Sequence, residues 1–311
     1  MARLVTVFGG AGFIGRYVVQ ALLREGARVR VVGRDAKRGF FVKPQGGLGQ
    51  TQFIAADVTK PATVARALAG SDSVINLVGI LSGAFQAIQV DGARTVAEEA
   101  AKAGVTALVH MSAIGADPAS PSAYGKSKGE GEAAVRAAFP GATILRPSIV
   151  FGPEDEFVNR FARMMQLSPM VPVIGGATRF QPVYVADVAK AAALAALDPG
   201  AHGGRLYELG GPETLTMAEL NRRIAAMTGR EPAFLDLPDG LAEGIARLGF
   251  LPGAPLTMDQ WRMLSRDNVV AEVAEGLAAL GIAPTPLASV APRWLVRYRR
   301  HGRFGGERKA G

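Results

Sequence analysis

Short apolar runs alternate with helix-like segments along the first 150 residues of the chain. The first apolar run, residues 4–8, is rich in β-branched residues and ends in glycines. A helix-forming segment, residues 16–25, follows and stops at Gly26. This alternation predicts right-handed βαβ units around a parallel sheet, and strands that are almost wholly apolar fit a sheet covered on both faces. Further strands are predicted at 29–32, 52–56, 73–78, 105–111 and 142–145, and a helix at 90–103.

Beyond Arg146-Pro147 the pattern loosens as proline and glycine become frequent. Residues 181–187 predict a short strand, with Asp187 placed to cap a helix at 188–197. Residues 214–225 form the clearest helix of the later part. The apolar stretch 237–251 is interpreted as a core helix, with contact to a partner or to lipid as the alternative.

The predicted fold class is therefore α/β: a doubly wound parallel Rossmann sheet with a smaller, mostly helical C-terminal region. We expect residues 1–150 and 181–211 to form the sheet domain. We expect residues 151–180 and 212–311 to form the smaller region, which would take a substrate or a partner.

The glycines that follow the first strand predict a dinucleotide site. Gly9 permits a tight turn, Gly12 lets the backbone approach a pyrophosphate, and Gly15 allows the helix to pack closely on the strand. The helix N-terminus would present free N–H groups and the positive end of its dipole to the phosphates, and Phe13 and Ile14 of the same segment are expected to contact the cofactor. An ordinary βα turn is the alternative, but the order strand, glycine turn, helix favours a dinucleotide.

The end of the second strand bears on the choice between NADP(H) and NAD(H). Arg34 stands where a carboxylate would bind the ribose 2′-hydroxyl of NAD, and its guanidinium can pair with a 2′-phosphate. Lys37 and Arg38 add positive charge, so the sequence favours NADP(H). Asp35 would favour NAD(H) if the strand ended one residue later.

Residues at the ends of the next two strands are placed along the path of the same cofactor. Asp57 and Val58 follow the third strand and are expected to contact the adenine ring. Leu77, Val78 and Gly79 follow the fourth and would line the route to the nicotinamide.

Ser112, Tyr124 and Lys128 form a second group of candidate residues. Tyr124 and Lys128 are four residues apart, so on a helix they share one face. The lysine cation is expected to lower the tyrosine pKa and to hold the nicotinamide ribose, while the tyrosine passes a proton to or from a substrate oxygen. Ser112 would hold that oxygen by a hydrogen bond.

Composition narrows the remaining possibilities. The 311 residues include no cysteine, and the three histidines show no metal-ligand spacing. We see no signal peptide, and no run of about 18 apolar residues that would predict a spanning helix. The net charge is +8, of which residues 293–311 carry +6, so we expect this basic tail to meet an acidic partner or an anionic membrane surface unless it is a frayed end. The body of the chain has no basic stripe with interleaved aromatic residues, so the sequence does not predict specific nucleic-acid binding.

Several motifs together resemble the extended short-chain dehydrogenase/reductase superfamily. They are the glycine segment 9–15, Asp57, Ser112, Tyr124 with Lys128, Arg146-Pro147 and the segment 182–189. Within it the chain looks most like the branch formed by the nucleotide-binding accessory subunit of respiratory complex I and its bacterial relatives. The segments that point to this branch are 6–19, 47–50, 74–79, 147–155 and 181–187.

The resemblance implies a tightly held NADPH, with Pro147 among the residues around it. It also implies a peripheral place on complex I beside its membrane domain, on the cytoplasmic side of a bacterial inner membrane, and a structural or regulatory role without established turnover. A working NADP(H)-dependent reductase, dehydrogenase or epimerase, on a quinone-related or sugar-nucleotide substrate, remains the alternative because Ser112, Tyr124 and Lys128 are all present. A regulator that senses NADP(H) would share the same site.

Overall fold

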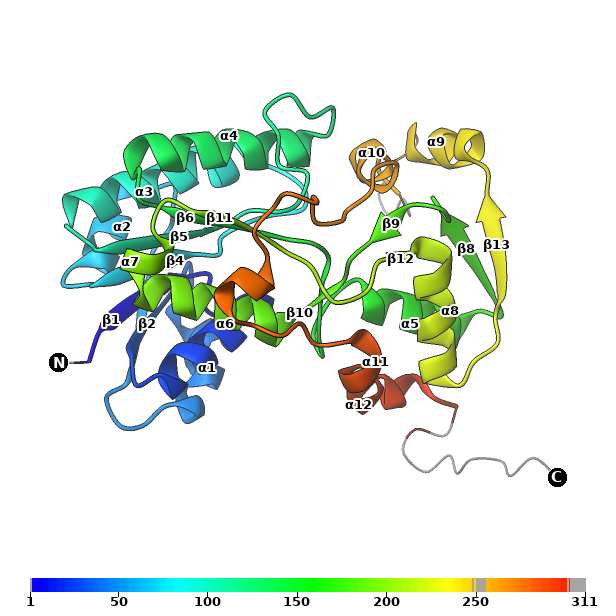
Figure 1. The fold of residues 1–311 in the computed structure, drawn as a ribbon, viewed down its shortest axis with the longest axis horizontal. Coiled ribbons are helices and arrows are strands. Elements are labelled where there is room, and N and C mark those ends of the chain that lie inside the picture. Colours follow the sequence, from blue (N-terminus) through cyan, green and yellow to red (C-terminus); the bar gives the residue numbers. More distant parts are fainter. Residues whose placement is uncertain (1, 248, 250–255, 301, 303–311) are drawn as a thin grey trace. The chain divides into compact units, whose positions relative to one another are not determined.

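The computed structural model describes residues 2–247, 249, 256–300 and 302 (Figure 1). The chain divides into two compact units, which we describe separately. The first comprises residues 1–147, 185–209 and 270–283, and the second comprises residues 148–184, 210–269 and 284–311. Residues 270–283 thus belong with the sheet, whereas the sequence analysis placed them in the smaller region.

A seven-stranded parallel sheet forms the centre of the first unit, in the order β11-β6-β5-β4-β1-β2-β3. The order reverses between β1 and β4, and in open α/β sheets ligands bind at such a switch point, outside the carboxyl ends of the strands. The strands are β1 (Leu4–Phe8), β2 (Arg28–Gly33), β3 (Thr51–Ala55), β4 (Ser73–Asn76), β5 (Ala107–Met111), β6 (Thr143–Pro147) and β11 (Leu206–Leu209). The predicted doubly wound sheet is confirmed.

Helices cover both faces of this sheet (Figure 1). On one face α1 (Phe13–Arg24) packs against α6 (Val185–Leu197). On the other, α2 (Pro61–Leu68), α3 (Gly92–Lys102) and α4 (Ala123–Ala138) pack in succession. The shorter segments of the unit are η1 (Ala36–Gln45), η2 (Gln86–Asp91), α7 (Pro199–His202) and η3 (Leu277–Leu280).

The apolar strands are buried because both faces are covered. All five residues of β1 and of β5 are buried, which explains why these runs show no alternation of apolar and polar residues. A core cluster between the sheet and α2, α3 and α4 joins strand residues to helix residues. It includes Phe8, Val32, Val74, Leu108, Ile144, Val64, Ala97 and Val135.

The second unit combines helices with three two-stranded pairs. The pairs are β7 (Val150–Phe151) with β10 (Val183–Tyr184), β8 (Met170–Ile174) with β13 (Ala233–Leu237), and β9 (Arg179–Phe180) with β12 (Leu215–Thr216). The helices are α5 (Val158–Leu167), α8 (Met217–Thr228), α9 (Asp239–Arg247), α10 (Met258–Leu264), α11 (Leu287–Val290), α12 (Pro292–Leu295) and η4 (Val296–Tyr298).

Three predicted helix starts are wrong by three residues. The helix α1 begins at Phe13 and not at residue 16. The helix α6 begins at Val185, so Asp187 lies in its first turn and is not its N-cap. The helix predicted from residue 214 begins at Met217, because Thr216 and Glu219 form a reciprocal capping box at its N-terminus. Pattern alone does not define a helix start to better than about a turn.

The predicted core helix at 237–251 is partly confirmed. Leu237 ends β13, and α9 follows from residue 239 to residue 247. Ala242 and Ala246 are buried, but the larger Leu241 is 60% exposed. Residues 248 and 250–251 of the predicted segment lie outside the described residues.

The basic tail begins later than the sequence indicated. Leu295 is fully buried and Tyr298 nearly so, both in the core of the second unit. Arg297 donates hydrogen bonds to the carbonyl of Pro153 and the side chain of Asn159, at 2.7 and 2.8 Å. Residues 293–298 are therefore part of the folded second unit, with Leu295 and Tyr298 in its core, and Arg303, Arg308 and Lys309 lie outside the described residues. No helix within the described ranges is long and apolar enough to cross a bilayer.

Candidate functional site

The glycine loop lies at the carboxyl end of β1, next to the switch point of the sheet. Gly9 has a φ of +78°, which favours glycine, and its N–H donates to the carbonyl of Val32 at 2.9 Å. The N–H of Gly12 donates to the carbonyl of Gly9, also at 2.9 Å. These bonds close a tight turn that leads directly into α1.

Gly15 shows how closely the helix lies on that turn. A Cβ atom at Gly15 would stand 2.2 Å from the carbonyl oxygen of Gly9 and 2.7 Å from Gly10. Gly12 is the N-cap residue of α1, and no side chain caps the helix there. The first turn of α1 also contains no acidic residue. The backbone thus forms a cradle that fits a dinucleotide pyrophosphate, which the helix N-terminus would attract.

Leu77, the first residue after β4, borders this cradle. A Cβ atom at Gly9 would lie 3.3 Å from the carbonyl carbon of Leu77, and the N–H of Leu77 donates to Phe8. Val78 is held by a bond from its N–H to the side-chain oxygen of Asn76 at 3.1 Å. Gly79 lies next to Gln89, whose side-chain oxygen would be 3.4 Å from a Cβ there.

Arg34 and Asp35, which follow β2, have different surroundings. The strand ends at Gly33, so Arg34 is the first residue after it and is exposed. Asp35 accepts a hydrogen bond from the N–H of Lys37 at 2.9 Å and caps η1. One oxygen of the Asp35 carboxylate is therefore engaged within η1, whereas the Arg34 side chain is exposed directly after the strand.

Asp57 and Val58 follow β3 at the same edge of the sheet. Asp57 accepts bonds from the N–H and the hydroxyl of Thr59, at 3.0 and 2.8 Å. These bonds, with a smaller effect from the charge of Arg34, hold the pKa of the Asp57 carboxyl below its usual value. The side chain of Val58 belongs to the core and packs against Gly92, so only its backbone is available to a ligand.

Lys128 joins the start of α4 to the end of β5. Its ammonium donates to the carbonyl of Met111 at 2.6 Å, and Ser112 follows Met111 directly. Ser122 caps α4 by accepting from Gly125, which sets Tyr124 in the first turn, one turn before Lys128. The Ser112 hydroxyl is buried and has no hydrogen-bond partner among the described residues, as expected of a group that awaits a ligand or water.

The pKa of Tyr124 is raised and not lowered as the sequence analysis expected. Burial raises the pKa of the Tyr124 phenol to about 12, so the phenol is protonated at neutral pH. Burial also lowers the pKa of Lys128 to about 8, partly offset by the nearby carboxylate of Glu132. The expectation from spacing took no account of the desolvation of both groups. In this state Tyr124 carries a proton that it could donate, but it is a weaker acid than an ordinary tyrosine.

His110, on β5, is buried beside this pair. Its Nδ1 atom lies 3.4 Å from the side-chain nitrogen of Asn76 on β4, and its Nε2 atom has no partner among the described residues. Burial and the charge of Lys128 lower the pKa of His110 to about 3, so the ring is neutral. His110 is thus a neutral residue packed within the strand.

The sequence analysis missed a buried ion-pair group behind Lys128. Arg146 forms a bidentate pair with Glu132, at 2.9 and 2.7 Å, and lies 3.5 Å from Glu208. Glu208 also accepts from the N–H of Ala271 at 2.9 Å. Glu132 follows Lys128 by four residues on α4, a spacing that could have identified it. Pro147, which follows Arg146 at the end of β6, is buried and accepts a bond from the N–H of Ile114 at 3.0 Å.

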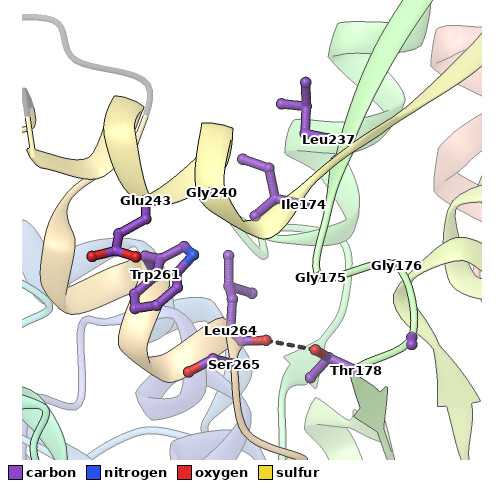
Figure 2. Close-up of a pocket in the computed structure, with 11 residues that line it drawn as sticks. Ile174, Gly175, Gly176, Thr178, Leu237, Gly240, Glu243, Trp261, Leu264 and Ser265 are labelled. Carbon is purple, nitrogen blue, oxygen red and sulfur yellow. Dashed lines mark hydrogen bonds between the residues drawn. The ribbon is translucent and has the colours of Figure 1, made fainter.

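A separate pocket of about 530 Å³ lies within the second unit (Figure 2). Its side chains are mostly apolar, and Glu243 lies beside the ring of Trp261. Thr178 donates its hydroxyl to the carbonyl of Leu264 at 2.6 Å, so its polar group is already satisfied. The other residues that line it are Ile174, Gly175, Gly176, Ala177, Leu237, Gly240 and Ser265.

Comparison with known proteins agrees with this architecture. The profile of the NAD dependent epimerase/dehydratase family matches residues 5–210. The mitochondrial NADH dehydrogenase (ubiquinone) 1 alpha subcomplex subunit 9 of Rattus norvegicus is 36% identical over 307 residues, which cover 96% of this chain and 81% of the rat protein. A ceramide reductase of Caulobacter vibrioides is 30% identical over 84% of this chain and 79% of its own length. Among solved structures, an NADPH-dependent quinone oxidoreductase of Escherichia coli superposes with a TM-score of 0.74 at 20% identity, covering 94% of this chain and 99% of its own.

Proposed function

Since the chain belongs to the NAD dependent epimerase/dehydratase family, we propose that it is an NADP(H)-binding accessory subunit of respiratory complex I. The single observation that carries this proposal is 36% identity to a complex I subunit along 96% of the chain. Because the similarity covers both units, it extends beyond the dinucleotide-binding fold to the rest of the protein. The complex and its membrane domain are then the partners, and we place the chain peripherally on the cytoplasmic side of a bacterial inner membrane.

The dinucleotide is held by the first unit. The glycine loop with Phe13 and Ile14 would take the pyrophosphate, and Arg34 the 2′-phosphate. Asp57 and the backbone of Val58 would meet the adenosine, while residues 77–79, Tyr124, Lys128 and Pro147 would surround the nicotinamide end. When bound, the dinucleotide supplies a hydride donor or acceptor.

Lys128 and Tyr124 can hold the cofactor without taking part in a reaction. Lys128 remains largely charged at pH 7 because its pKa is about 8, so it can still bind the ribose hydroxyls. Burial raises the pKa of the Tyr124 phenol to about 12, so the phenol is protonated at neutral pH and is a weaker acid than an ordinary tyrosine. Binding thus needs only the charged Lys128, whereas turnover also needs a substrate oxygen placed to take the proton of Tyr124.

The test is gentle solubilisation of the native membranes with an affinity tag on this chain. We expect the other subunits of complex I in the eluate and one NADP(H) per chain, released by denaturation and measured by its fluorescence. The matched control for tagging and purification is an Arg24→Ala variant, which changes an exposed residue at the C-terminal end of α1. Recovery of the tagged chain without any other complex I subunit would contradict the proposal.

A working NADP(H)-dependent reductase is the second candidate, and the unpartnered hydroxyl of Ser112 is the observation that favours it. In such an enzyme Ser112 would hold a substrate oxygen and Tyr124 would donate its proton to that oxygen. A panel of quinones and carbonyl compounds, followed by loss of NADPH absorbance, tests this candidate. Turnover that Tyr124→Phe abolishes, with NADPH binding retained, would replace the accessory role with an enzymatic one.

A further inference from the structure

Three large apolar side chains are exposed on the segment that connects β2 to β3. Phe40 is 51% exposed, Phe41 is 47% exposed and Leu48 is fully exposed. Isolated apolar residues on a surface are ordinary, but two adjacent phenylalanines with a leucine on one short segment are not. These residues lie outside the glycine loop and the Ser112, Tyr124 and Lys128 group.

The fold holds these side chains at the surface. The inward positions of η1 are taken by Gly39 and Val42, which are buried. Gly39 lies so close to the sheet that a Cβ there would stand 3.0 Å from the ring of Phe53 and 3.1 Å from Val31. The segment therefore cannot rotate to bring Phe40 or Phe41 inward without displacing β2 and β3.

Each of the two phenylalanine rings contacts a neighbouring side chain and remains about half exposed. The ring of Phe40 meets that of Phe53 edge-on, with centroids 5.1 Å apart. The guanidinium of Arg16 lies over the ring of Phe41, 4.7 Å from its centroid. Both aromatic side chains are thus ordered before they meet any partner, which reduces the entropy that docking costs.

Cations lie on the same segment as these apolar side chains. Lys37, Arg38 and Lys43 are exposed on η1 itself, and Arg16 stands against Phe41. The one acidic residue nearby in sequence, Asp35, caps η1 through the N–H of Lys37 and lies 3.9 Å from Arg38. The segment 36–48 therefore carries exposed apolar side chains together with exposed positive charges.

We propose that residues 36–48 are a membrane-docking surface that inserts Phe40, Phe41 and Leu48 at the interface of an anionic bilayer. Phenylalanine and leucine bury in the boundary between headgroups and acyl chains, and each nearby lysine or arginine is attracted to anionic headgroups. Anchoring that combines an apolar and a basic signal is stable where either alone is weak. This inference does not depend on the accessory role in complex I.

The composition of the surface favours lipid over an acidic protein. Specific protein interfaces bury about 800 Å² on each partner and are depleted in lysine. Here the apolar part is three side chains, and two of the cations on the segment, Lys37 and Lys43, are lysines. Long flexible cations suit the diffuse charge of a lipid surface and provide little of the directional bonding that fixes a protein partner.

Vesicle co-sedimentation of the purified full chain tests the proposal. The probes are vesicles of phosphatidylcholine with phosphatidylglycerol and vesicles of phosphatidylcholine alone, at low and high salt. We expect binding to the anionic vesicles that salt weakens but does not abolish. Leu48→Ser should weaken this binding at least threefold, and the double variant Phe40→Ser/Phe41→Ser at least tenfold.

Two controls separate docking by this segment from an effect on folding and from exposed apolar residues elsewhere in the same unit. Leu48 is fully exposed, so Leu48→Ser removes no packing and its thermal midpoint should not change. Val273→Ser changes an equally exposed apolar residue of the same unit outside the segment, and it should bind vesicles as the parent does. The fluorescence emission of the tryptophan introduced by Leu48→Trp should shift to the blue when anionic vesicles are added, and brominated lipid should quench it.

Unchanged vesicle binding in both serine variants would overturn the proposal, because attachment would then come from elsewhere in the chain. The absence of any binding by the parent would overturn it as well. If the serine variants instead lose association with complex I subunits in detergent, without lipid, the occupant is a protein surface and the lipid assignment is wrong. Dinucleotide binding by the same samples reports separately on the proposed function.

Discussion

Gly15→Ala tests the cradle on which the dinucleotide assignment depends. The added methyl group would stand 2.2 Å from the carbonyl oxygen of Gly9 and 2.7 Å from the backbone of Gly10. Real Cβ atoms do not approach other heavy atoms more closely than 3.0 Å, so the loop and the helix must separate by about 0.8 Å. The atoms in the way are backbone, so no side-chain rotation can relieve the contact.

The expected cost has two parts. Overpacking of this kind costs about 1–3 kcal/mol of folding free energy. Replacing glycine by alanine inside a helix returns about 1 kcal/mol, so the net loss of stability is about 0–2 kcal/mol. Binding suffers more, because a charge-assisted bond from a backbone N–H to phosphate contributes about 1.5–3 kcal/mol, so misaligning one such bond raises the NADPH dissociation constant about 10- to 100-fold.

Titration of NADPH fluorescence and thermal unfolding followed by circular dichroism measure the two parts separately. The matched control is Gly244→Ala in α9, where a Cβ meets nothing within 4 Å. It should leave NADPH affinity unchanged and stabilise the helix by about 0.5–1 kcal/mol. A Gly15→Ala protein that binds NADPH as tightly as the parent would refute the backbone cradle.

Three further predictions follow from single side chains. Arg34→Ala should weaken NADPH by about 1–3 kcal/mol and leave NADH unchanged in calorimetric titrations; equal effects on both would exclude a 2′-phosphate role. Burial lowers the pKa of Lys128 in the folded chain to about 8, so between about pH 8 and pH 10.5 the unfolded chain binds one proton more than the folded chain. The free energy of urea unfolding should therefore rise with pH over that window, until ionisation of the tyrosine in the unfolded chain opposes the rise near pH 10. Lys128→Met should remove the rise. Leu295→Ala should cost about 2–5 kcal/mol in the same assay, whereas an end that plays no part in the core would cost nothing.

The parts of the fold that the sequence predicted are those whose signals are local. Buried parallel strands are continuous apolar runs, and the glycines at 9, 12 and 15 are required by the path of the backbone itself. Helix starts were less certain because more than one polar residue could cap them, and the capping box of Thr216 and Glu219 decided one of them. The basic tail was assigned too much of the chain because charge conceals the buried Leu295 and Tyr298 that lie between the arginines.

The parts of the site that the sequence could not predict depend on residues distant in the chain. Arg146 meets Glu132 and Glu208 only because β6 lies between α4 and β11 in the folded unit. The pKa of Tyr124 depends on how much water the surrounding elements exclude, and the spacing of Tyr124 and Lys128 says nothing of that. Spacing placed both residues on one face of α4, but the expected lowering of the tyrosine pKa took only the lysine charge into account and not burial, which raises it.

Cofactor binding and catalysis make separable demands on this chain. Every residue that we assign to the dinucleotide lies in the first unit. A ligand that binds only the folded state adds stability that grows with its concentration over its dissociation constant, about 4 kcal/mol at a thousandfold excess. That gain is kept whether or not Tyr124 ever transfers a proton. Selection for a stable docking subunit would therefore preserve the glycine cradle and Lys128 whether or not Tyr124 also takes part in a reaction.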